Sequence, residues 1–516
     1  MEVYLLLCVL SISLVLFRWA RSHLSNPLPL PPGPPRYPLI GNALNTPTVM
    51  PWKTFRDWIK TYGDVIYLQI PKQSIIILGS ARAATDLLEK RSDIYSDRPK
   101  IVMHELIPMR WNFPLLGYSS EWRANRREFH QYFNQHAVAN YQSIQLHECR
   151  AFLKRALDNP TQIGQHIRLI YSAIILKVVY DMDITDMKHE YVQLAEKVAH
   201  NVSPTLVPGK FLVEFLPFLK YLPKWLPGMH FKRNATLCEE LIRQMVNGPF
   251  DVVKQSIAEG THGKSVAASL IERLQSHAES EGLQEELARN VAGSAYLAAA
   301  DTTTAAAQSF FVAMSLYPEI QRKGQAEIDL IVGRDRLPDF NDYDKLVYVQ
   351  AIMLESMRWI PVIPLGVPHR AMREDEYMGF RIPEGATILA NIWAMLHDPD
   401  DYPDPERFNP GRFLKDGRIN PDVRDPLQLA FGFGRRICPG RWLSSASLFM
   451  TIASVLHTLD IRPILEPDGK PYDPFTTIVD GVILSPDKIP CTLSPRSQSA
   501  ERLICDDVLN TSDMRA

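Results

Sequence analysis

Cysteine is scarce in this chain, and the few cysteines present are scattered along it. Only six occur in 516 residues, and no two of them stand in a Cys-x-x-Cys spacing. Such scatter favours a reduced compartment over a disulfide framework. Neither sign of charge is in marked excess, because the formal net charge is only −2. This balance gives no indication of nucleic-acid binding.

The chain also lacks internal repeats, and no linker interrupts the motifs that run from about residue 98 to residue 440. A chain of this length has room for about two to four domains, yet this continuity predicts one large domain at residues 37–495. Hydrophobic residues make up 46% of the chain and charged residues 22%, which is typical of a globular protein with a large core. Residues 496–516 are polar, and we expect them to form a mobile C-terminal tail.

The N-terminus carries a hydrophobic run. Residues 3–17 are almost wholly apolar and are followed by Arg18 and Arg21. A cleaved secretory signal would need a basic start and a small-residue cleavage site, whereas Glu2 makes this start acidic. The arginines after the run place the rest of the chain in the cytosol by the positive-inside rule. We therefore expect residues 1–21 to be an uncleaved anchor, with a cleaved signal and a buried core helix as the alternatives.

Residues 22–36 form the next segment and are rich in proline. Six prolines stand between positions 27 and 35, and proline at this density favours a stiff polyproline II conformation. We expect a semi-rigid hinge between the anchor and the main domain. A generic linker is the alternative, and the two differ little in their physics.

Apolar periodicity predicts the main secondary structure. Long amphipathic stretches between about residues 80 and 360 predict helices. Between about residues 360 and 440 prolines and glycines recur, which predicts loops with short strands. The clearest individual predictions are helices at residues 52–62 and 443–459 and strands at residues 64–70, 74–78 and 386–389. The fold class is therefore expected to be mainly α with small β-sheets (α+β).

Residues 431–440, with the sequence FGFGRRICPG, suit a loop around a heme iron. A thiolate from Cys438 is a soft ligand that favours splitting of the O–O bond of dioxygen. Glycines let the loop approach a flat ring closely, and Arg436 can donate a charge-assisted bond to a heme propionate. The five fixed positions of F-x-x-G-x-R-x-C-x-G recur by chance in on the order of one in ten thousand chains of this length. The alternative for a lone cysteine is a small buried hydrophobe.

This pattern resembles the cysteine loop of the cytochrome P450 family of heme-thiolate monooxygenases. The resemblance implies the cytochrome P450 fold and heme b as the cofactor, with Cys438 as the axial ligand of the iron. It covers nearly the whole chain. The amino-acid sequence of residues 95–99 and 430–436 resembles that of the microsomal members from higher fungi, many of which serve secondary metabolism or oxidise xenobiotics.

A second motif lies inside a long apolar helix predicted at residues 287–317. Small residues precede Asp301 and Thr302, and an acid followed by a hydroxyl can relay protons. Threonine side chains that bond back to the i−4 carbonyl also bend helices. The resemblance implies that Asp301 and Thr302 are catalytic and deliver protons during oxygen activation. The chain departs from the family pattern at Ala299, where glycine is usual; a plain helix–helix contact is the alternative reading.

Heme propionates need cations and hydrogen-bond donors. Trp122 and Arg126 resemble the ends of the family's W-x-x-x-R helix, where an indole N–H and a guanidinium suit that task. His369 and Arg98 occupy comparable places in the family pattern. The resemblance therefore implies that these four residues bind heme together with Arg436. Each of them alone is more often a surface charge or part of a capped loop.

Glu355 and Arg358 match the family's E-x-x-R motif. The i,i+3 spacing places both side chains on one helix face, where they can pair. Arg407, in the Pro-Glu-Arg-Phe sequence downstream, resembles the third partner of a buried Glu–Arg–Arg network. We expect this network to be structural and to hold the cysteine loop in place.

Four apolar segments predict contacts with lipophilic molecules. Residues 207–231 mix aromatic residues with prolines and lysines, which suits a membrane interface; a buried helix–loop–helix is the alternative. Residues 103–118 form an apolar loop that covers the heme in the family's layout, although simple core packing is also consistent with it. Residues 360–367 and 475–479 are expected to add apolar walls to a pocket for a lipophilic substrate.

Together these motifs predict a membrane-anchored monooxygenase of the endoplasmic reticulum that oxidises a lipophilic small molecule. Nothing in the chain resembles a flavin or nicotinamide domain, so we expect electrons from NADPH–cytochrome P450 reductase, with cytochrome b5 as a further donor. Arg435, Arg436 and Arg441 predict a basic docking surface. The alternatives are a reductase-independent isomerase or dehydratase that acts on peroxides, and a non-catalytic heme- or lipid-binding membrane protein. The Asp301–Thr302 pair argues against the isomerase.

Overall fold

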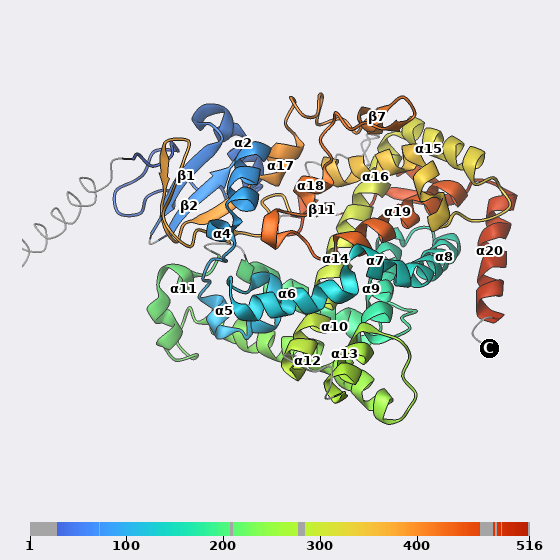
Figure 1. Ribbon diagram of the computed structural model, residues 1–516, viewed down its shortest axis with the longest axis horizontal. Helices are drawn as coiled ribbons and strands as arrows, with labels where there is room; N and C mark the ends of the chain where they lie inside the picture. The colour runs from blue at the N-terminus through green and yellow to red at the C-terminus, as the bar shows by residue number, and fades with distance from the viewer. Residues whose placement is uncertain are drawn as a thin grey trace, which may run out of the picture.

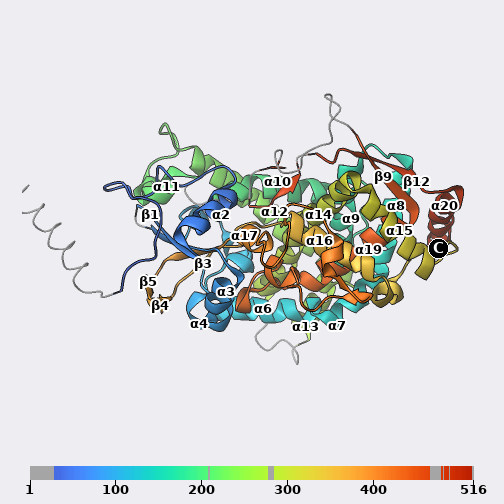
Figure 2. The ribbon, with the colours of Figure 1, turned by 90° about the horizontal axis from the view of Figure 1, so that it is seen from above.

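The computed structural model describes residues 28–71, 73–206, 210–276, 284–464, 478–479, 482–486 and 488–513. The predicted anchor and the start of the proline-rich hinge lie outside them. No helix of the described part is both long and apolar enough to cross a membrane. Figures 1 and 2 show a small sheet region at one end and a larger mass of helices that forms the rest.

Helices dominate, as the apolar periodicity predicts. The longer ones are α2 (Pro51–Tyr62), α6 (Ser120–Phe133), α8 (Gln142–Asp158), α9 (Ile163–Tyr180), α10 (Glu190–Val202), α12 (His230–Ala258), α13 (Val266–Gln275), α14 (Glu285–Leu316), α15 (Pro318–Ile331), α16 (Val347–Trp359), α19 (Arg441–Thr458) and α20 (Gln498–Asp513). The short ones are α3 (Ala81–Ala84), α4 (Ser92–Tyr95), α5 (Met103–Leu106), α7 (Gln135–Val138), α11 (Leu212–Phe215), α17 (Ile392–Leu396) and α18 (Leu427–Ala430).

The largest sheet has four strands in the order β1 (Val65–Ile70), β2 (Gln73–Leu78), β6 (Thr387–Ala390) and β3 (His369–Arg370). β1 and β2 form the predicted antiparallel hairpin, whereas β6 adds to β2 in parallel from a distant part of the chain. The remaining strands form two-stranded sheets: β4 (Asp375–Tyr377) with β5 (Phe380–Ile382), β7 (Leu414–Lys415) with β8 (Arg418–Ile419), β9 (Leu459–Pro463) with β12 (Cys491–Pro495), and β10 (Ile478–Val479) with β11 (Ser485–Pro486). This architecture confirms the α+β fold class.

The central helix is α14, which begins two residues before the predicted start. Glu285 and Glu286 form its acidic first turn, where carboxylates interact favourably with the positive end of the helix dipole. Most of the helix is buried, and Figures 1 and 2 show it running through the middle of the helical part. It therefore carries the Asp301–Thr302 motif into the interior.

The described end of the proline-rich hinge lies against the sheet region. The carbonyl oxygen of Pro32 accepts the backbone N–H of Tyr67 at 2.9 Å, and that of Pro29 accepts the N–H of Arg381 at 2.8 Å. Because proline has no N–H of its own, Pro29 and Pro32 can only accept backbone hydrogen bonds here. Residues 29–32 are thereby fixed to β1 and β5.

The C-terminal segment differs from the mobile tail that its polar composition predicts. Gln498–Asp513 forms helix α20, which Figure 1 shows along the outer edge beside α8. Ala500 and Ile504 are buried, and the two are four positions apart, so they lie on one face of the helix. Arg496, just before the helix, forms an ion pair with Asp329 at 2.8 Å. A narrow apolar stripe is thus enough to dock a largely polar helix.

Candidate active site

Cys438 lies in a tight loop between α18 and α19. Its backbone N–H donates to the carbonyl oxygen of Phe431 at 2.8 Å and closes the loop. Gly434 has a φ of +53°, and a Cβ on it would collide with the carbonyl oxygen of Leu88. Only glycine fits a backbone that is both left-handed and this close to another segment. The loop therefore rests directly on the segment that follows α3.

The environment of the Cys438 sulfur contains opposing electrostatic effects. Burial raises the pKa of the thiol, whereas the backbone N–H groups of Gly440 and Arg441 and the charge of Arg126 lower that pKa. Amides aimed at a sulfur stabilise the thiolate, the form of cysteine that binds metals. Cys438 is free and only partly buried, so its side chain borders open space inside the protein.

The Asp301–Thr302 motif borders the same interior. Thr303, the next residue, has its hydroxyl oxygen 3.2 Å from that of Ser444 in the first turn of α19, which fixes this part of α14 beside the cysteine loop. Ala298 is exposed although most of its helix is buried. This side of α14 therefore borders space that solvent can enter. Because Ala298 and Thr302 are four positions apart, Thr302 lies on the same face.

Thr302 is held by a hydrogen bond within its own helix, and Asp301 has a shifted pKa. The Thr302 hydroxyl donates to the carbonyl oxygen of Ala298 at 2.7 Å, the i−4 bond that its sequence predicts. Burial raises the pKa of the Asp301 carboxyl, the charge of Arg168 lowers it, and that of Glu196 raises it. Asp301 is thus biased toward its protonated form, which suits a group that passes protons on.

Three basic side chains are buried together on the other side of the cysteine loop. Arg98, His369 and Arg436 are only 7%, 7% and 8% exposed. Burial lowers the pKa of Arg98 well below its usual value, and the charge of Arg436 lowers it further. Burial and both arginines also lower the pKa of His369. The charge of Asp97 offsets part of this effect on both arginines, and cations this desolvated favour a further anion nearby.

The hydrogen bonds of these cations go mainly to backbone carbonyls. Arg436 donates to the carbonyl oxygens of Ser96 at 2.7 Å and Leu116 at 2.8 Å, but its buried Nη1 has no partner among the described residues. Arg98 donates to the carbonyl oxygens of Pro114, Val367 and Pro368. The site thus combines positive charge with one unsatisfied donor.

Trp122 and Arg126 lie on α6 next to these cations. The Arg436 guanidinium carbon lies 4.2 Å from the centroid of the Trp122 ring, so the buried indole supports the charge as a cation–π partner. Burial lowers the pKa of Arg126, and the neighbouring Cys438 raises it. The structure therefore brings all six predicted heme-binding residues to one place.

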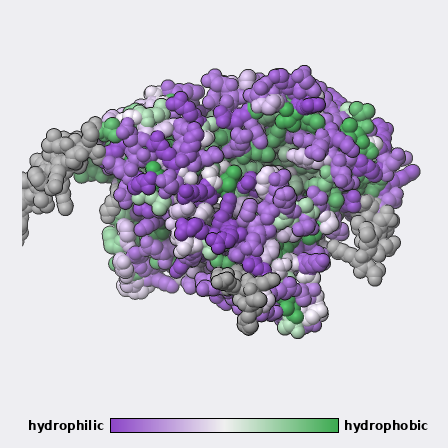
Figure 3. Space-filling model, in the orientation of Figure 1, coloured by the Kyte–Doolittle hydropathy of each residue, from purple (hydrophilic) through white to green (hydrophobic). Residues whose placement is uncertain are grey.

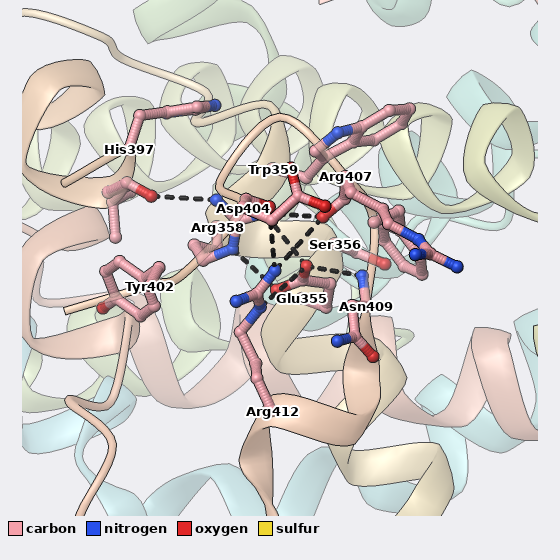
Figure 4. Close-up of polar contacts among 12 residues, drawn as sticks. Glu355, Ser356, Arg358, Trp359, His397, Tyr402, Asp404, Arg407, Asn409 and Arg412 are labelled. Carbon is pink, nitrogen blue, oxygen red and sulfur yellow. Dashed lines mark hydrogen bonds and ion pairs between the residues drawn. The ribbon is translucent and has the colours of Figure 1, made fainter. Parts of the chain in front are cut away.

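The predicted Glu355–Arg358 pair is fully buried (Figure 4). Arg358 Nε and Nη2 donate to the two carboxylate oxygens of Glu355 at 2.7 and 2.9 Å. Arg358 Nη1 donates to the carbonyl oxygen of Leu396 at 2.9 Å, and the backbone N–H of Asn409 donates to Glu355 at 2.8 Å. Both members are 0% exposed, and their hydrogen-bonding groups are satisfied as a buried ion pair requires.

The third partner of this network is Arg412, and the prediction of Arg407 is wrong. Arg412 Nε lies 3.2 Å from Glu355 Oε1. Arg407 is exposed, and Figure 4 shows its side chain directed away from the carboxylate. The sequence offers the Pro-x-Arg-Phe spacing twice, at residues 405–408 and 410–413. The second copy fits because Pro410–Phe413 forms a 3-10 turn that packs beside α16.

The comparisons with known proteins agree with this geometry. The family model described as Cytochrome P450 matches residues 31–491. The chain belongs to the cytochrome P450 family. Cytochrome P450 monooxygenases COX1 and COX2 of Coprinopsis cinerea are each 41% identical to it over 92% of the chain and 93% and 91% of their own lengths. A cytochrome P450 monooxygenase of Armillaria gallica, ARMGADRAFT_974139, is 38% identical over 97% of the chain and 99% of its own length.

Cytochrome P450 proteins use heme with a cysteine thiolate as the axial ligand, and the residues of this chain fit that group. Heme carries two carboxylates, which match the buried Arg98 and Arg436 and the partnerless Nη1. The partly accessible Cys438 lies near Arg126. A cation cluster and a soft ligand so close together match the two parts of heme that need protein partners, the propionates and the iron.

Sequence reasoning missed the aromatic and hydroxyl contacts that join these segments. Tyr118 accepts a hydrogen bond from Arg435 at 2.7 Å, and Thr303 meets Ser444. The apolar loop at residues 103–118 packs onto α14 through Ser294, whose hydroxyl donates to the carbonyl oxygen of Trp111 at 3.0 Å. These residues belong to no motif, because each contact joins positions more than a hundred residues apart.

Proposed function

We propose that this cytochrome P450 monooxygenase is a membrane-anchored enzyme that oxidises a lipophilic small molecule with O2 and electrons from a separate reductase. The observation that supports it best is that Cys438 lies next to the buried cations and that the Asp301–Thr302 segment of α14 is fixed beside the cysteine loop. Thiolate-ligated heme, when bound there, supplies the oxygen-splitting chemistry. The protein residues hold the cofactor and move protons.

In this proposal Cys438 would ligate the heme iron, and the amides of Gly440 and Arg441 oppose the effect of burial and so favour its thiolate form. Arg436, Arg98, Arg126, Trp122 and His369 bind the propionates. His369 donates its Nδ1 proton to the carbonyl oxygen of Tyr95 at 2.7 Å. Only its Nε2 is free to contact the cofactor, and this nitrogen would donate to a propionate only when the ring is protonated, a form that the carboxylate itself would favour.

Asp301 and Thr302 are proposed as the proton-delivering pair. Because Thr302 donates its own proton to Ala298, its oxygen lone pairs remain available to accept a proton or bind water. Asp301, with its raised pKa, can supply the proton. The methyl group of Ala299 narrows the groove beside this pair, and we expect it to limit how water enters.

The anchor at residues 1–21 is proposed from its apolar sequence, and exposed apolar residues support a second membrane contact. Leu212, Phe218, Tyr221 and Trp225 are 57–80% exposed, although most of the face in Figure 3 is hydrophilic. Phe215 packs against the sheet core. This contact fixes residues 212–225 beside the sheet, at the same end of the protein as the first described residues. A surface of this kind suits the interface of the endoplasmic reticulum membrane.

NADPH–cytochrome P450 reductase is the proposed electron donor, with cytochrome b5 as a further donor. Of the three arginines proposed for docking, Arg435 is exposed and Arg441 partly so, whereas Arg436 is buried and serves the cofactor instead. The substrate is proposed to come from fungal secondary metabolism or from xenobiotics, in keeping with an apolar pocket.

The proposal is tested by expressing the full chain in yeast microsomes with a fungal reductase. Terpenoids, steroids, fatty acids and polycyclic aromatics are supplied, and products are followed by mass. A product heavier by one oxygen atom, dependent on NADPH and absent in C438A, is the expected result. Heme binding without NADPH-dependent product, but with turnover of hydroperoxides alone, would instead identify a reductase-independent isomerase or dehydratase.

A further inference from the structure

Tyr118 lies between the start of α6 and the cysteine loop and contacts an arginine from each. Arg435 Nη1 donates to the Tyr118 hydroxyl at 2.7 Å. The guanidinium carbons of Arg435 and Arg123 each lie 5.4 Å from the centroid of the Tyr118 ring. One aromatic side chain thus holds two cations through cation–π contacts.

Both arginines reach the surface without a carboxylate to neutralise them. Arg123 and Arg435 are exposed, and the contacts that their guanidinium groups form within the described residues go to Tyr118 and to no carboxylate. Two guanidinium groups on one ring repel each other, and an anion that approaches them relieves the part of this repulsion that water and salt do not screen. The pair is therefore a preformed site for an acidic group from another molecule.

This surface pair is also connected to the buried cations of the heme site. The rings of Tyr118 and Trp122 lie 5.2 Å apart between centroids, and Trp122 supports the Arg436 guanidinium at 4.2 Å. Since Arg435 and Arg436 are neighbours in the chain, Tyr118 and Trp122 contact adjacent residues of the cysteine loop. A partner that docks on the arginine pair would lie close to the cofactor edge.

We propose that Tyr118 is a positioning residue that holds Arg123 and Arg435 as a ready-made cationic pair for an acidic side chain of the electron donor. The inference rests on the proposed function, because it names residues through which the reductase docks. An acidic protein face is favoured over lipid, since Figure 2 places α6 and the exposed apolar α11 toward opposite sides of the molecule. Charge complementarity of this kind acts mainly on association and its salt dependence.

The test measures heme reduction in the full-length holoenzyme by a fungal NADPH–cytochrome P450 reductase titrated over a range of concentrations. We expect Y118L to raise the KM for the reductase on the order of fivefold, because two cation–π contacts are lost. Y118F retains the ring and loses only the hydroxyl bond, so its KM should rise less. In all variants dithionite should reduce the heme as in the wild type.

A double-mutant cycle separates positioning from a merely structural role. In a background that carries both R123Q and R435Q, Y118L should add little further increase in KM, and the salt dependence of KM should be equally weak with and without it. The matched control is Y377F. Tyr377 likewise combines a hydroxyl bond, to Asp86 at 2.9 Å, with a guanidinium on its ring, that of Arg91 at 5.5 Å; this variant should leave the KM unchanged.

Three results would overturn the inference: an unchanged KM in Y118L, full additivity with the arginine substitutions, or an effect on binding to anionic lipid vesicles instead of the reductase. Failure of the proposed function gives a different result. In that case the wild type itself binds heme and is reduced by dithionite, but the reductase does not reduce it at any concentration.

Discussion

The carboxylate of Glu355 lies 3.2 Å from Nε of Arg412, a residue 57 positions further along the chain. Arg412 also donates to the carbonyl oxygen of Pro403 at 2.7 Å, so the same guanidinium fixes the loop that follows α17. The Glu355–Arg358 pair on α16 is thereby joined to the chain that leads into the cysteine loop. Helix α16 is rigid, and the network restricts the movement of the loop by tying it to this helix.

This relationship predicts different outcomes for two neighbouring arginines. R412Q leaves the buried Glu355–Arg358 pair without its third partner and removes the bonds of Arg412 to backbone carbonyls, which should lower the free energy of unfolding by roughly 1–3 kcal/mol. R407Q alters an exposed side chain and should change it by less than about 0.5 kcal/mol. Urea unfolding of the holoenzyme, together with the fraction that retains heme, measures both. Equal effects of the two substitutions would contradict the assignment of Arg412.

Gly434 and Gly440 form a second matched pair. G434A places a methyl group against the Leu88 carbonyl in a left-handed backbone, so it should cost at least about 1–2 kcal/mol and impair heme binding. Gly440 has a φ of −89° and open space around its missing Cβ, and G440A retains the amide that points at the sulfur. Heme content after purification distinguishes them, and a normal heme content in G434A would argue against close packing of the loop.

The Asp301 carboxyl gives a pH-dependent prediction. Its pKa is raised in the folded protein, so the folded state holds this proton more tightly than the unfolded state does. The associated stability is present below the unfolded pKa and is lost as the pH rises through the folded pKa. D301N removes this dependence and should raise the melting temperature at pH 7 relative to the wild type, but not at pH 4. The same substitution should slow product formation by roughly 10²-fold or more.

The pH dependence of stability that His104 on α5 contributes is opposite in sign to that of Asp301. Burial lowers its pKa to about 4, so its contribution to stability is present above the unfolded pKa and is lost as the pH falls through the folded pKa. At pH 5.5 the wild type should therefore lose at most about 1 kcal/mol relative to H104Q, after allowance for partial solvent screening. H200Q, at an exposed position of α10, serves as the control, and urea unfolding at pH 7.5 and 5.5 is the measurement.

Local patterns predict the elements of this fold well. The β1–β2 hairpin, helix α2 and the long α14 follow from β-branched runs and from apolar spacing, which are properties of short windows of sequence. The same reasoning mistook the C-terminal helix for a tail, because Ala500 and Ile504 are too few to stand out among polar neighbours. Docking against α8 supplies the stability that the window itself does not show.

The candidate site was predicted where a family motif names the residue, and was missed where only distance in space joins residues. Arg98, Trp122, Arg126 and Arg436 carry the motif signal, and all of them lie in the cation cluster. The choice between Arg407 and Arg412 depended on which copy of a repeated spacing faces α16, and only the folded chain resolves that. Tyr118 belongs to no sequence motif, and two of its partners lie in segments that are distant from each other in the chain: Arg435 in the cysteine loop and Trp122 in α6.

The parallel pairing of β2 with β6 limits how early the sheet can form during synthesis. Ile76 pairs with Ile388, and Gln73 bonds to Thr387 across 314 positions, so a ribosome must complete most of the chain before the sheet can close. Cys438 emerges later still, whereas Arg98 and Trp122 emerge early. With synthesis at roughly 5–20 residues per second, the early half waits tens of seconds with its cations and apolar surfaces unpartnered. Cofactor capture therefore belongs to the final moments of synthesis or after it, and chaperones have a long interval in which to act.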